Sequence, residues 1–157
     1  MNPNDVVLGA LLVAACITDV REQKIRNIHT FPAIVAGLVA SPFFLPAWWS
    51  GLAGFIVAFA LAVPGWRFGG AIRAGDVKLL LAVGALTGPE VGARAVLWSY
   101  ALAFPFGLAV LLARGRLGRL WRFWVKGERS DPTLVAYGPV IAVATLLARF
   151  WDWPDLG

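Results

Sequence analysis

The segment "IRAGDVKLLLAVGAL" (residues 72–86) places an aspartate and a lysine directly before a run of apolar residues. A run of this kind predicts a buried helix, and burying it does not require a carboxylate. The position of Asp76 at the start of the run therefore has to be explained by what its side chain faces.

The composition of the chain is typical of an integral membrane protein. Of the 157 residues, 59% are hydrophobic and 15% are charged, whereas soluble domains are about a quarter charged. The single cysteine, Cys16, excludes an internal disulfide and a cysteine-based zinc site. The first apolar stretch lacks the basic flank and the cleavage site of a signal peptide, so we expect a retained span.

Six apolar segments have lengths near the roughly 20 residues that a membrane helix needs. We therefore expect an all-α fold, a polytopic membrane helix bundle of about six transmembrane helices that forms a single domain over residues 1–157. The expected spans cover residues 4–20, 28–47, 50–66, 77–90, 91–113 and 133–151.

The basic residues indicate the orientation of this bundle. Twelve of the 14 Lys and Arg residues lie in three alternate segments, 20–27, 67–78 and 114–130. Because basic residues favour cytoplasmic loops, these segments are expected in the cytoplasm and both termini outside. The net charge of +5 then reflects membrane topology, and we expect no nucleic-acid partner.

This topology places two carboxylates at one membrane depth. Asp19 ends the first expected span and Asp76 precedes the fourth, both at the cytoplasmic side. If these spans pack together, the carboxylates can meet, and a close pair shares a proton because the second charge is opposed by the first. Such a pair can take a proton from water and donate one to a carbonyl oxygen, which is the chemistry of an aspartic protease.

Two structural interpretations compete with this one. Asp76 after Gly75 is also a good helix N-cap, since aspartate accepts hydrogen bonds from free N–H groups at a helix start. Asp19 at a span end is compatible with simple solvation in the headgroup region, where a charge is tolerated.

Three motifs in order resemble the type IV prepilin peptidases, a family of Gly-x-Gly-Asp aspartic proteases. The segment "DVREQKIRN" (19–27) resembles their first signature, and "AGDVKLLLAVGAL" (74–86) resembles their second. The segment "AYGPVIA" (136–142) is similar to the aromatic-Gly-Pro element of their last helix. The resemblance covers essentially the whole chain.

Two positions depart from the family pattern. Arg73 replaces the first motif glycine and Arg26 replaces a proline, while both aspartates remain. Longer family members carry a cysteine-rich insert and methylate their product. Only eight residues separate Asp19 from Ile28, so the chain is similar to the short peptidases of Flp/Tad-type pili, which implies a peptidase without methyltransferase activity.

The resemblance implies a hydrolase, an aspartic-type endopeptidase of the bacterial inner (plasma) membrane. It would remove the leader peptide of prepilin-like precursors at the cytoplasmic face, cutting after a glycine and using no cofactor.

Asp19 and Asp76 would be catalytic, with the acid and base roles left open. Gly75, Lys78 and Asn27 would support them, with Gly75 admitting the substrate backbone and Lys78 contacting lipid phosphate or loop carbonyls. Tyr137, Gly138, Pro139 and Arg73 are candidates for residues near the substrate. For the first three, the favoured interpretation is core packing at the cytoplasmic end of the last span.

The basic segment 115–129 predicts a second membrane feature. Its apolar and basic residues fall on opposite faces of a helix, as in an amphipathic helix that lies on the anionic lipids of the inner leaflet.

We expect no metal, because Asp19 and Asp76 supply only two ligands. The competing class is a non-enzymatic transporter or pilus-assembly partner that uses both aspartates for cations or protons.

Overall fold

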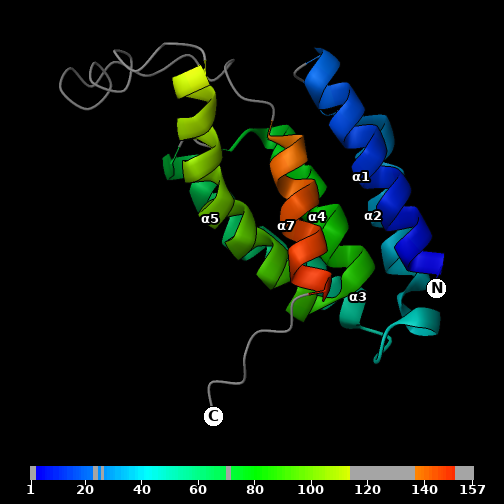
Figure 1. Ribbon diagram of the computed structural model, residues 1–157. Coiled ribbons are helices and arrows are strands. Elements are labelled where there is room, and N and C mark those ends of the chain that lie inside the picture. The colour runs from blue at the N-terminus through cyan, green and yellow to red at the C-terminus, as the bar shows by residue number, and fades with distance from the viewer. Residues whose placement is uncertain (1–2, 23–24, 26, 70–71, 114–136, 151–157) are drawn as a thin grey trace.

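The computed structural model describes residues 3–22, 25, 27–69, 72–113 and 137–150. Within these ranges the chain is helical and contains no strand (Figure 1), so the all-α prediction is confirmed. The helices are α1 (Pro3–Glu22), α2 (Asn27–Phe44), α3 (Ser50–Pro64), α4 (Ala74–Thr87), α5 (Pro89–Ala113) and α7 (Gly138–Phe150), with a π-helical turn, η1 (Gly65–Gly69), directly after α3.

The predicted boundary between the fourth and fifth spans is confirmed at "TGPE" (87–90). Gly88 separates α4 from α5 with φ of 87°, a left-handed conformation that favours glycine. Pro89 then starts α5. Proline is tolerated there, because an N–H group in the first turn of a helix would have no carbonyl acceptor within that helix. The start of α4 differs from the prediction, since Ala74 rather than Val77 is its first residue.

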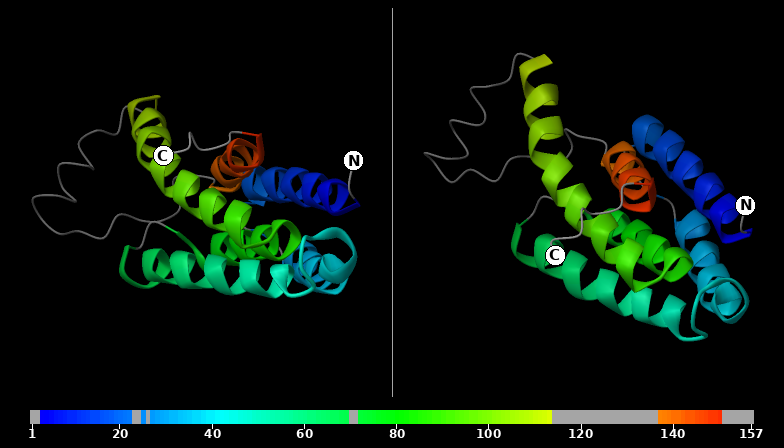
Figure 2. Two further views of the ribbon diagram at one scale, coloured as in Figure 1. Left: turned by 90° about the horizontal axis from the view of Figure 1, so that it is seen from below. Right: turned by 60° about the horizontal axis from the view of Figure 1, so that its bottom comes forward.

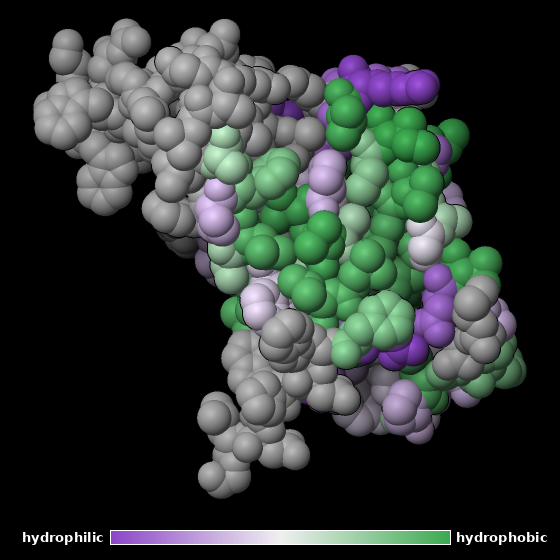
Figure 3. All heavy atoms as spheres, in the orientation of Figure 1, coloured by the Kyte–Doolittle hydropathy of each residue, from purple (hydrophilic) through white to green (hydrophobic). Residues whose placement is uncertain are grey.

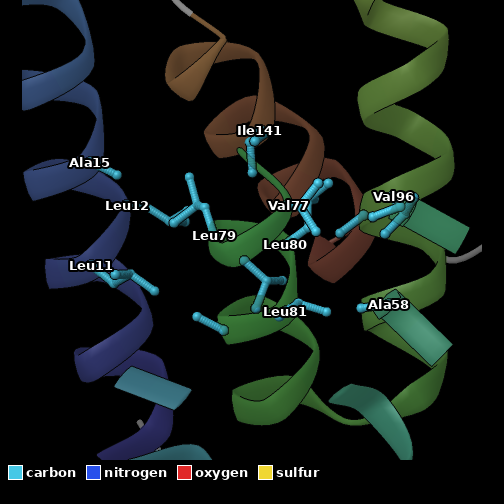
Figure 4. Close-up of a cluster of buried hydrophobic side chains, with 14 of the residues drawn as sticks. Leu11, Leu12, Ala15, Ala58, Val77, Leu79, Leu80, Leu81, Val96 and Ile141 are labelled. Atoms are coloured by element: carbon cyan, nitrogen blue, oxygen red, sulfur yellow. The ribbon is translucent and has the colours of Figure 1, made fainter. Parts of the chain in front are cut away.

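Helix α4 forms the centre of the bundle and packs against all five other α-helices. In both views of Figure 2, α3 and α7 lie on opposite sides of it. Every residue from Leu79 to Leu86 is buried, and Leu79 and Leu80 are fully inaccessible. Figure 4 shows Leu11 and Leu12 of α1 directed toward α4, with Ile141 of α7 above them.

Small residues bring the neighbouring helices close to α4. Gly54 of α3 and Gly84 of α4 face each other so closely that a Cβ atom on either would overlap the backbone of the other. A Cβ atom on Gly37 of α2 would lie 2.7 Å from the carbonyl carbon of Ala85. Close backbone approach at small residues is typical of helices that associate in membranes, where dispersion contacts replace the hydrophobic effect.

On the face shown in Figure 3, the middle of the bundle is mainly apolar, and the most hydrophilic residues lie toward its two ends. Three described segments are long and apolar enough to cross a membrane: Pro3–Glu22, Asn27–Phe44 and Ser50–Arg67. Large side chains such as Val13, Ile28 and Phe43 are exposed on these helices. This surface is that of a membrane protein. The predicted amphipathic segment 115–129 lies outside the described residues.

Candidate active site

Asp19 of α1 and Asp76 of α4 line one pocket of about 320 Å³. Both side chains are buried, with 3% and 2% of their surface exposed. Their helices are in contact, so the packing that the two-carboxylate interpretation needs is present. The pocket wall also includes Ile25, Asn27, Arg73, Gly75 and Lys78.

Asp76 is held by the start of its own helix. Arg73 is the N-cap of α4 in an extended conformation, and its backbone N–H donates to Oδ2 of Asp76 across 2.8 Å. Asp76 is therefore the third helical residue, reaching back to the N-cap N–H, as an acidic residue does in a capping box. Asp76 is therefore not the N-cap itself, because α4 begins at Ala74, three residues earlier than expected, but its carboxylate still accepts an N–H at the helix start, as the structural interpretation supposed.

The surroundings of Asp76 favour its protonated form. Asp76 precedes the apolar run that starts at Val77, and burial raises the pKa of its carboxyl to about 6. The N–H of Arg73 lowers this pKa, the charge of Asp19 raises it, and the charge of Arg73 lowers it by a smaller amount. Desolvation thus dominates, and Asp76 carries a proton at pH values where a solvated aspartate is ionised.

Asp19 is held by a different helix. The backbone N–H of Gly138, the first residue of α7, donates to Oδ2 of Asp19 across 2.6 Å. Asp19 is thus buried and hydrogen-bonded, and the alternative of a carboxylate solvated in the headgroup region is wrong.

The residues beside Gly138 fix the start of α7. The hydroxyl of Tyr137 donates to the carbonyl oxygen of Ser99 on α5 across 2.9 Å. Pro139 follows in the first turn of α7, a position where proline is favoured. The sequence analysis named Tyr137, Gly138 and Pro139 but missed Ser99, since a buried serine that contributes its backbone carbonyl leaves no sequence signal.

Lys78 and Asn27 meet at the edge of the pocket. The Lys78 ammonium donates to Oδ1 of Asn27 across 3.0 Å and lies 5.4 Å from the ring centre of Phe31. The expectation that Lys78 contacts lipid phosphate or loop carbonyls did not foresee this partner. The contact joins α4 to α2 beside Asp76.

Gly75 packs against the connection between α1 and α2. A Cβ atom at this position would lie 3.3 Å from Cβ of Ile25, in the short connection between α1 and α2. Ile25 is buried with 6% of its surface exposed. The expected role of Gly75 in admitting a substrate backbone is therefore joined by a structural one, close packing against Ile25.

The described residues contain no group of three or more His, Cys, Asp or Glu side chains that could hold a metal ion. What the pocket does offer is a pair of buried carboxylates, one favouring its proton. Such a pair can act as acid and base on one water molecule.

Comparison with known proteins points to the same family that the three sequence motifs resemble. The sequence model of the type IV leader peptidase family matches residues 6–108. The chain is 30% identical over 150 residues to a prepilin leader peptidase/N-methyltransferase of Bacillus subtilis (strain 168), covering 93% of this chain and 54% of the relative. It is 29% identical over 153 residues to the corresponding protein of Xanthomonas campestris pv. campestris, covering 93% of this chain and 49% of the relative.

The chain thus spans about half the length of these curated relatives. No solved structure is significantly similar to it. Because the family match covers most of the chain and includes both Asp19 and Asp76, this protein belongs to the type IV leader peptidase family.

Proposed function

We propose that this protein is a membrane-embedded aspartic endopeptidase that removes the N-terminal leader of prepilin-like precursors. The observation that carries the proposal is the pocket shared by Asp19 and Asp76, two buried carboxylates from α1 and α4. Family membership supports leader cleavage, and the relatives from Bacillus and Xanthomonas are named for action on prepilin leaders.

The chemistry follows from the pair. One carboxylate takes a proton from a water molecule, which attacks the scissile carbonyl carbon, while the other donates its proton to the carbonyl oxygen. The resulting tetrahedral intermediate collapses when the first carboxylate passes the proton taken from water to the amide nitrogen, the second takes its proton back from the oxygen, and the C–N bond breaks. The raised pKa of Asp76, about 6, supports a pair that keeps one proton at pH values up to about 6.

The location of the reaction is part of the proposal. The basic segment 20–27 directly follows Asp19 and the basic segment 67–78 contains Asp76, and basic segments favour the cytoplasmic side. We therefore place the pocket at the cytoplasmic face of the bacterial inner membrane, in a multi-pass protein. Anionic lipids of the inner leaflet would bind the basic segment 115–129.

The substrate would be a precursor with a leader followed by an apolar helix, cut after a glycine. The proposal concerns leader removal alone. That no methyl transfer accompanies it stays a prediction, checked by the mass of the new N-terminus, which would lack the added methyl group.

Co-expression with a candidate prepilin tests the proposal. Asp19→Asn and Asp76→Asn should each lower cleavage by about 10³-fold or more, because each removes a group that transfers protons. Asp5→Asn is the matched control, since Asp5 pairs with Arg149 outside the pocket and its loss should leave cleavage unchanged. Undiminished cleavage in either active-site variant, with the protein present in the membrane, would favour the transporter or assembly role.

A further inference from the structure

Asp19 and Asp76 are positioned in different ways. Asp76 accepts a hydrogen bond from Arg73, three residues away on the same helix start. Asp19 accepts one from Gly138, 119 positions away. The orientation of Asp76 is therefore local to α4, whereas that of Asp19 depends on how α7 docks against α1.

We propose that Gly138 is a positioning residue for Asp19, whose N–H fixes Oδ2 and leaves Oδ1 as the oxygen that acts on the reacting water. This inference rests on the proposed peptidase function. The first N–H groups of a helix have no acceptor within it, so the N–H of Gly138 is available to hold a carboxylate.

The absence of a side chain at position 138 is part of the arrangement. A Cβ atom there would lie 3.1 Å from both Cβ and Oδ2 of Asp19, and 3.4 Å from the carbonyl oxygen of Ala15. Both neighbours belong to α1, so a methyl group would push α7 and the Asp19 carboxylate apart by a few tenths of an ångström.

Tyr137 sets where the Gly138 N–H points. Its hydroxyl is bonded to the carbonyl oxygen of Ser99, which is fully buried in α5. Helix α5 thus anchors the start of α7, and the start of α7 orients Asp19. If Gly138 had only a structural role, it would contribute to the packing of α7 against α1. Replacing it would then not change the rate of the chemical step in the protein that folds.

The test measures kcat and KM for prepilin cleavage by the purified full-length protein. Gly138→Ala should lower kcat about tenfold or more at unchanged KM, since small misplacements of a reacting group lower rates steeply. The control is Gly9→Ala, the same change on α1 at a site where a Cβ atom meets nothing within 4 Å. It should match the wild type. Wild-type kcat in folded Gly138→Ala protein would overturn the proposal.

A second variant keeps the test decisive if Gly138→Ala does not fold. Tyr137→Phe removes the bond to Ser99 without adding an atom, and it should lower kcat by a smaller factor at unchanged KM. Wild-type kcat in this variant would then overturn the proposal. If Asp19→Asn and Asp76→Asn abolish cleavage while Gly138→Ala cleaves normally, the positioning role alone fails. Undiminished cleavage by the Asp19→Asn protein would instead overturn the proposed peptidase function.

Discussion

The Nζ atom of Lys78 donates a hydrogen bond to Oδ1 of Asn27 across 3.0 Å and thereby joins α4 to α2 beside Asp76. Both residues line the pocket that holds the two aspartates. We expect a contact in this place to restrain the wall of the pocket without taking part in proton transfer. Its energetic contribution can therefore be separated from that of the carboxylates.

We expect Lys78→Met and Asn27→Ala to affect cleavage through one shared interaction. Each should lower kcat/KM several-fold, and the double variant should lose less than the product of the two losses. The expected coupling is about 0.5–1.5 kcal/mol, as for a single net hydrogen bond. The measurement is a double-mutant cycle, with cleavage kinetics of the wild type, the two single variants and the double variant. Fully additive effects would show that the two residues act independently.

Asp76→Asn should stabilise the protein at high pH. The pKa of Asp76 is raised from 3.8 to about 6 in the folded state, so folding favours the protonated carboxyl. That stability is fully present below pH 3.8 and is lost as the pH rises through about 6. The full shift corresponds to about 3 kcal/mol.

Thermal unfolding in detergent checks this pH dependence. Above pH 7 the Asp76→Asn protein should unfold at a higher temperature than the wild type, and the difference should shrink toward pH 4. Asp5→Asn controls for the loss of an acidic group elsewhere in the chain. Parallel pH curves for the wild type and Asp76→Asn would contradict the expectation.

Gly54→Ala should destabilise the contact between α3 and α4. The new methyl group would overlap the backbone of Gly84, and overpacking of this kind costs about 1–3 kcal/mol. The melting temperature in detergent measures the effect. Gly107→Ala is the matched control, because a Cβ atom there meets nothing within 4 Å. Equal melting temperatures for the two variants would argue against close packing at Gly54.

Leu79→Ala should destabilise the core around α4. Leu79 is fully buried among side chains from several helices, and removing its side chain leaves a cavity that costs about 2–5 kcal/mol. Leu52→Ala on α3 removes the same atoms from a side chain that is 51% exposed, so its effect should stay below about 1 kcal/mol. The same unfolding assay compares them. Similar losses at both positions would place α4 at the surface rather than the centre.

Much of the fold could be predicted because it is encoded locally. Apolar runs and the Gly88-Pro89 break give the helices their approximate bounds, and "TGPE" separates α4 from α5 as expected. The start of α4 was missed by three residues, since Ala74 and Gly75 carry no apolar signal and the cap is formed by the backbone of Arg73.

The sequence by itself determined the class of protein, the helices and the two carboxylates at the ends of separate segments. Those features depend on hydropathy and on residues close together in the chain. The tertiary structure decided that α4 lies at the centre, that Lys78 meets Asn27 and that Gly138 holds Asp19. These contacts join residues 51 and 119 positions apart, and they depend on how closely small residues let the helices approach, which no local pattern encodes.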